Sequence, residues 1–398
     1  MEFSTHKQIS SLAAEVSDSI SQYQVTGGEK DRLYALKQVT QLARSIEKPA
    51  DVIHKIGFSL TVPMALKIAI DMELFIVLTK ATSFVTWKEL AAPKNAEKAL
   101  VERIMRVLVA NGFAEEHGPG KYTSTYLSNQ MTEKASVGLL DSIFTDFLPA
   151  IHKTPIFLKH TSYQNPTNPT KGPVQYAYAT TLSCWDWLAA NPQALDRFNS
   201  FMEGDRGDMI YWADWFPVKE RLLHGAVKGD VPFLVDVGGG RGHELRAFKQ
   251  RFPMGPGQLV LEDLPFVIDD IQELDVDIKK VKYDFFCPQP VKGARAYYFK
   301  HILHDWSDEN CQKILTNTAA AMKRGYSKIL IEDYILPDQN ADSRQTTMDM
   351  MVMVFCPGME RTQQMWTELL ASVGLKVKKF WLPGHDGLGI IEAEISDS

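Results

Sequence analysis

The sequence contains few cysteines: Cys184, Cys287, Cys311 and Cys356 are scattered over its 398 residues without paired spacing. This distribution argues against a disulfide framework and against a zinc site, and it fits reduced thiols in the cytoplasm. Positive charge is also scarce, since 43 Lys and Arg oppose 49 Asp and Glu and the net charge is -6 at pH 7. We therefore expect no nucleic-acid partner, because neutralising phosphates requires an excess of Lys and Arg.

The N-terminal region lacks the features of a targeting or membrane segment. Residues 1–24 are polar and carry acidic side chains, whereas a signal peptide has a basic start followed by an apolar run. No stretch reaches the roughly 18 consecutive apolar residues of a membrane span. We expect a cytoplasmic protein with no membrane partner, and its 398 residues suggest two domains rather than one core.

Helical patterns dominate the N-terminal third of the chain. Residues 62–75 are apolar nearly all round, which predicts one long buried helix, in a core or between subunits. A short helix from Thr86, a second helix over 97–111 and a hairpin between 113–116 and 121–123 follow in the order of a winged helix. Its second helix carries few positive charges, so a DNA-binding regulator is the weaker alternative. These charges are Lys98, Arg103 and Arg106, opposed by Glu97 and Glu102.

Strands and helices alternate from Pro232 onward. This alternation predicts an α/β fold with a parallel, doubly wound sheet. A ligand of such a sheet binds at the carboxyl ends of its strands. The predicted strands cover 233–237, 258–262, 294–299 and 328–332, and the predicted helices cover 242–252 and 308–324.

A glycine-rich loop, residues 236–242, connects the first of these strands to its helix. Its glycines let the backbone approach a ligand closely, and the amides at the helix N-terminus face that ligand. His243 stands where the dinucleotide fingerprint requires Gly or Ala, which favours a nucleoside ligand without a pyrophosphate. The acids Glu262 and Asp263 end the next strand, where a carboxylate can hold both ribose hydroxyls. The alternative is a tight turn with surface acids.

A second group of polar residues, Lys300 to Asp308, follows a predicted strand. Histidine titrates near neutral pH, so His304 can take a proton from a phenol or enol whose oxygen attacks a methyl group. The two histidines and two aspartates of this segment also suggest a metal site. We expect no metal, because other candidate ligands are remote in the sequence.

Together these motifs resemble those of the caffeate-type O-methyltransferases of plants and fungi. From about residue 55 to the end they occur in the order and spacing of that family, at 236–242, 262–268, 283–286, 300–308, 335–337 and 358–362. The resemblance implies a Rossmann-like methyltransferase domain that uses S-adenosylmethionine, preceded by a mostly helical, winged-helix dimerisation domain. The longer N-terminal region and the Met-rich segment 348–353 look like the fungal branch, whose acceptors are usually polyketide or polyketide-peptide products.

The same resemblance implies a division into three parts. Residues 1–135 would form the dimerisation domain of a homodimer, 136–230 a helical linker with the substrate pocket, and 231–398 the catalytic domain. The partners would then be a second copy of the chain and a small-molecule substrate.

Cofactor-binding positions of the family are matched residue by residue. Gly238 and Gly240 would line the methionine part of S-adenosylmethionine, and Asp263 would hold the ribose. Asp284 and Phe285 would border the adenine, with Lys300 beside it. The complete predicted set is Asp236, Gly238, Gly240, Asp263, Leu264, Asp284, Phe285, Lys300 and Arg206, the last toward the cofactor carboxylate.

The catalytic residues implied by the resemblance are His304 as general base, with Glu332 and Glu360 as the two acids that orient it. A carboxylate on the second ring nitrogen fixes the tautomer and raises the basicity of an imidazole. Cys356 stands where many members have Asn, so the acceptor should differ from a phenylpropanoid. The predicted acceptor pocket contains Phe198, Met202, Asp305, Met353 and Cys356. Ordinary core packing explains the pocket aromatic and methionine residues equally well.

One alternative activity stays open. Some fungal relatives bind the cofactor and catalyse dehydration or pericyclic ring formation without methyl transfer, and neither the fold nor the glycine loop excludes this. An intact His304 favours methyl transfer to a phenol or enol hydroxyl of a small secondary metabolite, because one such relative has lost the base.

Overall fold

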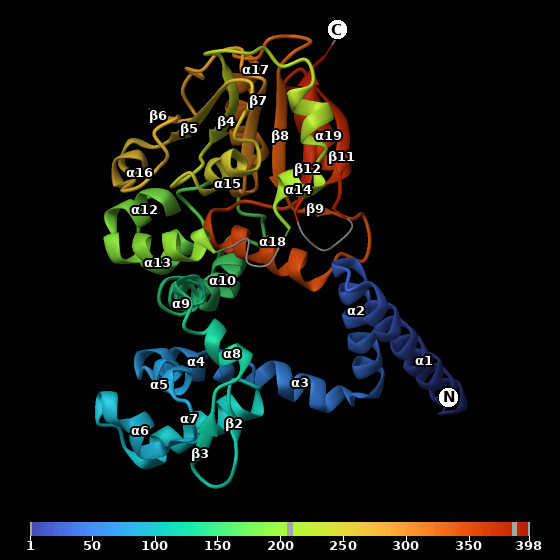
Figure 1. Cartoon of the computed structure of the whole chain (residues 1–398), viewed down its shortest axis with the longest axis vertical. Helices are drawn as coiled ribbons and strands as arrows, with labels where there is room; N and C mark the ends of the chain where they lie inside the picture. Colours follow the sequence, from blue (N-terminus) through green and yellow to red (C-terminus); the bar gives the residue numbers. More distant parts are fainter. Residues whose placement is uncertain (1, 205–209, 384–387, 397–398) are drawn as a thin grey trace. The chain divides into compact units, whose positions relative to one another are not determined.

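Two compact units make up the chain (Figure 1). The computed structural model describes residues 2–204, 210–383 and 388–396. The first unit holds residues 1–148 and 188–207, and the second unit holds residues 149–187 and 208–398. Each unit has its own buried core, and each is described by itself. The three-part division expected from the sequence stays a prediction.

The first unit is mostly helical. Its core lies among α4, α5 and α7, where Ala69, Leu74 and Leu108 are fully buried. Its elements are α1 (Glu2–Thr26), α2 (Glu29–Ile46), α3 (Pro49–Phe58), α4 (Thr61–Asp71), α5 (Leu74–Lys80), β1 (Val85–Thr86), α6 (Trp87–Ala91), η1 (Ala92–Lys94), α7 (Lys98–Ala110), β2 (Glu115–Glu116), β3 (Lys121–Thr123), α8 (Tyr126–Gln130), α9 (Lys134–Asp141), η2 (Ser142–Phe147) and α13 (Pro192–Glu203).

Two predictions for this unit have different outcomes. The single helix predicted over 62–75 is wrong, because α4 ends at Asp71 and Glu73 adopts a left-handed conformation with φ of 61° before α5 begins. The hairpin predicted after residue 112 is confirmed. Strand β3 pairs antiparallel with both β2 and β1, so the short strands form one three-stranded sheet.

Helix α3 exposes its apolar side chains. It buries none of its residues, and Ile53, Ile56 and Phe58 are each more than 60% exposed. Among the described residues, one helical stretch, Pro49–Asp71, is long and apolar enough to cross a membrane by length and composition alone. Exposed apolar side chains in this number indicate a partner surface.

The second unit contains a seven-stranded sheet with the order β11-β12-β8-β7-β4-β5-β6. Strands β4 to β8 are parallel, which confirms the predicted α/β class, while β12 and β11 add an antiparallel edge that was not predicted. The elements are α10 (Leu148–His160), α11 (Pro173–Tyr178), α12 (Cys184–Ala190), α14 (Trp212–Trp215), η3 (Lys219–Leu223), β4 (Pro232–Val237), α15 (His243–Arg251), β5 (Gln258–Asp263), α16 (Pro265–Asp270), β6 (Ile278–Lys282), β7 (Ala296–Lys300), η4 (Leu303–Asp305), α17 (Asp308–Ala319), β8 (Lys328–Asp333), β9 (Ile335–Leu336), α18 (Ser343–Phe355), β10 (Arg361–Thr362), α19 (Gln363–Ser372), β11 (Leu375–Trp381) and β12 (Gly389–Ile395).

Alternate residues of the central strands pack into two separate cores, one on each face of the sheet. On β8, Ile331 belongs to the core that α17 and α19 cover, whereas Leu330 belongs to the core that α14 and α15 cover. Tyr298 of β7 lies on the same face as Leu330. The period of two along a strand therefore decides which side chains of this sheet meet.

The strand order reverses between β4 and β7. The chain runs outward from β4 through β5 to β6, then returns to place β7 on the other side of β4. Ligands of open α/β sheets bind at the carboxyl ends of strands at such a reversal. Both polar motifs of the sequence, residues 236–242 and 300–308, follow these two strands.

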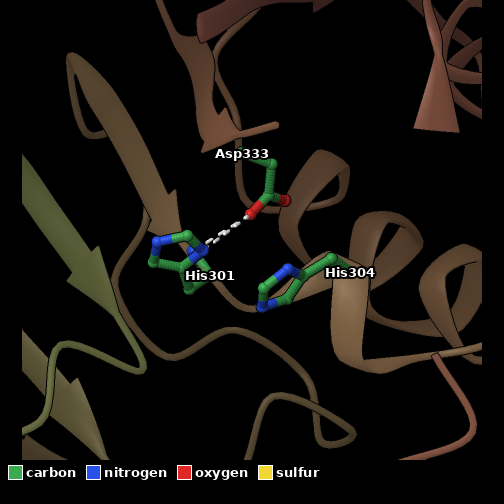
Figure 2. A group of neighbouring side chains, drawn as sticks. All are labelled: His301, His304 and Asp333. Atoms are coloured by element: carbon green, nitrogen blue, oxygen red, sulfur yellow. Dashed lines mark hydrogen bonds and ion pairs between the residues drawn. The ribbon is translucent and has the colours of Figure 1, made fainter. Parts of the chain in front are cut away.

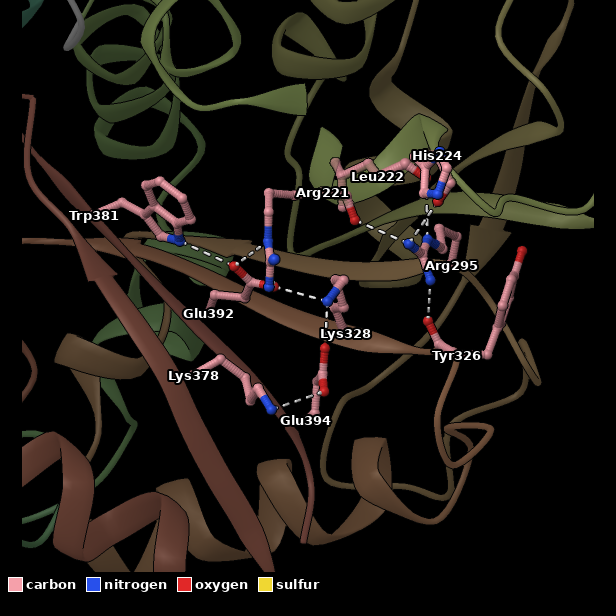
Figure 3. Close-up of polar contacts among 10 residues, drawn as sticks. All are labelled: Arg221, Leu222, His224, Arg295, Tyr326, Lys328, Lys378, Trp381, Glu392 and Glu394. Atoms are coloured by element: carbon pink, nitrogen blue, oxygen red, sulfur yellow. Dashed lines mark hydrogen bonds and ion pairs between the residues drawn. The ribbon is translucent and has the colours of Figure 1, made fainter. Parts of the chain in front are cut away.

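Buried charges connect η3 to the antiparallel edge of the sheet (Figure 3). Glu392 of β12 is fully buried and accepts hydrogen bonds from Arg221 at 2.6 Å, Lys328 at 2.8 Å and the Trp381 indole at 3.0 Å. Together these donors lower the pKa of the Glu392 carboxyl although burial alone would raise it. Arg295 donates to the backbone carbonyls of Leu222, Tyr326, Arg221 and His224.

Candidate functional site

The glycine loop makes a tight turn at the end of β4. Gly238, Gly240 and Gly242 have φ values of 75°, 58° and 76°, which glycine adopts without strain. A Cβ atom on Gly238 would lie 2.5 Å from Cδ1 of Ile302, so a larger residue there requires the Ile302 side chain to shift. At Gly240 a Cβ atom would meet nothing within 4 Å. The loop therefore packs on the segment after β7 at one glycine and faces open space at the other.

Asp263, at the end of β5, is held by the same loop. Its Oδ2 accepts a hydrogen bond from the Gly240 amide at 2.8 Å, and its Oδ1 accepts one from the Leu264 amide at 2.7 Å. Burial raises the pKa of Asp263 to about 6, although the two amides favour the charged form. The carboxylate is thus fixed beside the loop, and each oxygen keeps a second lone pair for a ligand hydroxyl.

Carboxylates outnumber cations beside the glycine loop. Asp236 is buried, and its Oδ2 has no hydrogen-bond partner in the part of the chain that the structure describes. Burial raises the pKa of Asp236, as do the nearby carboxylates of Glu244 and Asp263, while Lys300 lowers it. The Lys300 ammonium lies 3.5 Å from Glu244 Oε1.

These residues fit S-adenosylmethionine better than a dinucleotide. A buried carboxylate requires a cation or a hydrogen-bond donor, and the ammonium or sulfonium of the cofactor supplies positive charge. A pyrophosphate would add negative charge beside Asp236 and Asp263. The open space at Gly240 and the fixed carboxylate of Asp263 suit a nucleoside ligand with ribose hydroxyls.

The predicted adenine-side residues also lie near the loop. The Phe285 ring lies 3.9 Å from the Cβ position of Gly238 and packs edge-on against Trp306 at 5.9 Å. Asp284 accepts a hydrogen bond from the Phe286 amide at 3.0 Å. Asp284 and Phe285 follow β6, and Lys300 ends β7; because these strands are parallel to β4, the residues lie at the same edge of the sheet as the loop.

A tightly held turn, η4, presents His304 at the same end. A Cβ atom on Gly358 would lie 2.0 Å from the His304 carbonyl oxygen, which also accepts the Met359 amide at 2.8 Å. Arg361 is fully buried and donates to the carbonyl oxygens of Leu303 at 3.0 Å and Trp306 at 2.7 Å. Sequence reasoning gave Arg361 no role, although it directly follows the predicted acid Glu360.

The His304 ring is buried among carboxylates. Its Nδ1 lies 2.7 Å from Glu360 Oε1, and its Nε2 lies 3.5 Å from Asp305 Oδ1. Burial alone would lower the pKa of His304, but Glu360, Asp305 and Asp333 outweigh it and raise that pKa to about 10. The structure thus brings the predicted base and one predicted acid together.

The second acid beside the base is Asp333 and not Glu332, which corrects the sequence-based assignment (Figure 2). Asp333 and His301 each have a ligand atom within 4.8 Å of one on His304. Neighbouring residues of a strand point to opposite sides. Glu332 therefore lies on the other face of β8 from Asp333, where it accepts a hydrogen bond from the Tyr298 hydroxyl. Asp333 directly follows the predicted residue. Because side chains alternate between the two faces of β8, this difference of one position decides which carboxylate lies beside His304.

His301, His304 and Asp333 are also the side chains that could hold a metal ion among the described residues. The two imidazole rings are stacked, with centroids 4.9 Å apart and planes inclined by 28°. Metal-binding lone pairs lie in the ring planes, and planes this close to parallel do not converge at the roughly 2 Å of a metal–nitrogen bond. The geometry therefore favours acid–base chemistry at this cluster.

Asp305 and Cys356 lie together beside His304. The Cys356 thiol donates to Asp305 Oδ1 at 3.1 Å and lies 3.2 Å from the Val352 carbonyl oxygen. Burial raises the pKa of Asp305 to about 6, whereas His304 and Cys356 lower it. Met353 is half-buried on α18, one turn before Cys356. Their contact with an acceptor stays a prediction.

Three predicted residues are not placed at this cluster. Phe198 and Met202 are half-buried on α13, which belongs to the first unit, so their role in the pocket stays a prediction. Arg206 lies outside the described residues.

Comparisons with known proteins give the following matches. Residues 168–376 match the family described as O-methyltransferase domain, and residues 55–134 match the O-methyltransferase dimerisation domain. O-methyltransferase penC of Penicillium thymicola is 39% identical over 354 residues, 88% of this chain and 88% of that protein. The solved structure of a pericyclic reaction enzyme has a TM-score of 0.89 at 25% identity, over 97% of this chain and 100% of the other. OxaC in complex with SAH and oxaline has a TM-score of 0.86 at 26% identity, over 98% of this chain and 100% of the other.

Proposed function

The chain belongs to the S-adenosylmethionine-dependent O-methyltransferase family, and from that membership we propose that it methylates a phenol or enol hydroxyl of a polyketide-like secondary metabolite. The observation that supports this most is the contact of 2.7 Å between His304 Nδ1 and Glu360 at the sheet end that carries the glycine loop. The pair is a base with its orienting acid, and methyl transfer to a hydroxyl requires the removal of one proton.

S-adenosylmethionine, when bound, supplies an activated methyl group. Gly238, Gly240 and Asp263 would hold it, with Asp236 beside its positive charge. His304 in its neutral form takes the acceptor proton on Nε2, because Glu360 occupies Nδ1 and fixes the tautomer. The carboxylates that raise its pKa to about 10 keep the ring protonated near neutral pH, so methyl transfer should rise with pH. The buried turn keeps water away from the ring and holds it in one orientation, so alignment and proton removal are both prepared before the acceptor enters.

The substitution His304→Ala tests the role of the base. Because Glu360 and the glycine loop stay in place, we expect S-adenosylhomocysteine to bind with unchanged affinity by calorimetry. Methyl transfer to a panel of phenolic and enolic acceptors should fall by about two to four powers of ten, as for a lost general base. His117→Ala, in the exposed hairpin of the first unit, is the matched control and should behave as wild type. Undiminished transfer by the His304 variant would refute the assignment.

A second activity is supported by the similarity to a pericyclic reaction enzyme. In that case the protein would use the bound cofactor during dehydration or ring closure and would leave its methyl group in place. The presence of His304 with Glu360 favours methyl transfer. Formation of S-adenosylhomocysteine during turnover distinguishes the two activities.

We propose that the protein is a cytoplasmic homodimer that associates through its winged-helix-like first unit. The dimerisation family match over 55–134 and the exposed Ile53, Ile56 and Phe58 of α3 support the interface, and four free cysteines support a reducing compartment. Sedimentation velocity at micromolar concentration should give a dimer, and Ile56→Glu should give a monomer. Val276→Glu, on the exposed surface of the second unit, should stay dimeric. A monomeric wild-type protein would contradict the proposal.

A further inference from the structure

His301 holds an unusual backbone conformation directly after β7. Its φ of 52° lies in the left-handed region, which a bulky side chain occupies at a cost. Two acceptors on neighbouring strand β8 maintain it: the His301 amide lies 3.2 Å from the Glu332 carbonyl oxygen and 3.1 Å from Asp333 Oδ1. Strained residues that are held in this way concentrate at functional sites.

The His301 side chain contacts both the base and its second acid (Figure 2). Its ring stacks on the His304 ring with centroids 4.9 Å apart, and its Nδ1 lies 3.7 Å from Asp333 Oδ1. The ring is largely buried, since 13% of the side chain is exposed. His301 therefore contacts the face of the base, whereas Glu360 contacts its edge.

These two contacts restrain the His304 ring in different directions. The hydrogen bond from Nδ1 to Glu360 lies in the ring plane and still allows the ring to rock about that bond. A second ring stacked on its face opposes this rocking. At the same time the His301 amide fixes the carboxyl group of Asp333. Burial raises the pKa of Asp333 to about 8, and its charged form stabilises the imidazolium that forms when the base accepts a proton.

We propose that His301 is a positioning residue for the methyl transfer, which holds the ring plane of His304 and the carboxylate of Asp333. This inference rests on the proposed function, in which His304 is the base. The strained backbone at His301 is the means by which one residue contacts both groups.

Three substitutions separate the ring from the backbone. His301→Asn removes the ring but tolerates the left-handed conformation, and His301→Gly removes both the ring and the strain. His301→Phe keeps a flat ring against His304 but loses the two ring nitrogens. The Gly variant keeps the test valid if the Asn variant folds poorly.

The expected results are a change in kcat without a change in cofactor binding. For His301→Asn and His301→Gly, kcat should fall by about 10-fold to 100-fold, because small misalignments of a reacting group have effects of this size. For His301→Phe the plateau kcat should stay close to wild type. The affinity for S-adenosylhomocysteine should be unchanged in all three.

The pH dependence of kcat distinguishes a positioning role of His301 from a merely structural role, which would leave the profile unchanged. The groups that face His304 are Glu360 before β10, Asp333 at the end of β8, Asp305 in η4 and His301 after β7. An imidazolium at His301 would disfavour a second positive charge on His304, and each substitution removes this effect. The rise of kcat with pH should therefore move to higher pH in the Asn, Gly and Phe variants alike.

Wild-type kcat and an unchanged pH profile in a folded Asn variant would overturn this inference. An equal loss of kcat in the Phe and Asn variants would also overturn the stacking role. If the wild-type protein forms no S-adenosylhomocysteine with any acceptor, the proposed function itself fails. The two failures are thus distinguishable.

Discussion

Gly238→Ala is the change with the most sharply defined structural consequence. Gly238 has φ of 75°, and an added Cβ atom would lie 2.5 Å from Ile302 Cδ1 and 3.2 Å from Cγ1. Alanine therefore meets two separate costs, a left-handed backbone and a steric contact with the segment that leads to His304. Because Cδ1 is the end of a flexible side chain, the contact is relieved by a shift of the Ile302 side chain, which changes the packing between the loop and this segment.

Gly374→Ala is a matched control for the backbone cost. Gly374 also has φ of 75°, but a Cβ atom there would meet nothing within 4 Å. The left-handed conformation of an L-residue costs about 1–2 kcal/mol, so Gly374→Ala should lower the free energy of unfolding by that amount. Gly238→Ala should lower it by a further ~0.5–1.5 kcal/mol, the cost of moving the Ile302 side chain off its preferred rotamer.

Urea-induced unfolding and calorimetric titration with S-adenosylhomocysteine measure both effects. We expect Gly374→Ala to bind the ligand as wild type does. Gly238→Ala should bind it at least about tenfold more weakly, which corresponds to 1.4 kcal/mol. Wild-type affinity in the Gly238 variant would refute the placement of the cofactor on this loop. Equal unfolding free energies in the two variants would refute the steric reasoning.

Three further predictions concern buried acids. Glu360→Gln removes a negative charge next to His304, so the pKa of that histidine, measured by NMR, should fall well below about 10, and an unchanged titration would contradict the contact. Glu262 has a pKa of about 7 because it is buried, so its charging destabilises the fold as pH rises from about 4.5 through 7. Glu262→Gln should therefore raise Tm at pH 8 and leave it unchanged at pH 4, whereas a gain at both would contradict the sign. Glu392→Gln removes the carboxylate that pairs the buried Lys328 with the partly exposed Arg221 and should cost about 1.5–3 kcal/mol in urea unfolding, against about 0–1 kcal/mol for the more exposed Glu394→Gln.

The sequence predicted the parts of the site that depend on local patterns. The glycine loop with Asp263, the segment around His304 and the α/β alternation are each encoded within one strand and the turn after it. The family, the fold class and the cofactor predicted from these motifs are confirmed. Local signals were sufficient here because parallel strands bring their carboxyl ends to one edge of the sheet.

Features that depend on packing between distant segments were not predictable in the same way. The choice between Glu332 and Asp333 depends on which face of β8 the His304 turn covers. Because the two acids are adjacent, the sequence does not indicate which of them faces that turn. The break between α4 and α5 depends on the single left-handed residue Glu73. The antiparallel strands β11 and β12 were missed because they follow one another directly, whereas the preceding strands alternate with helices.

The central claim is that this protein moves a methyl group, with His304 as the base. The most direct test incubates the wild-type protein and His304→Ala with S-adenosylmethionine and phenolic or enolic acceptors, and quantifies S-adenosylhomocysteine and product by mass spectrometry. We predict one S-adenosylhomocysteine for each acceptor that gains a methyl group in the wild type, and near-complete loss of both in the variant. Conversion of an acceptor without S-adenosylhomocysteine or a gain in mass would contradict the account.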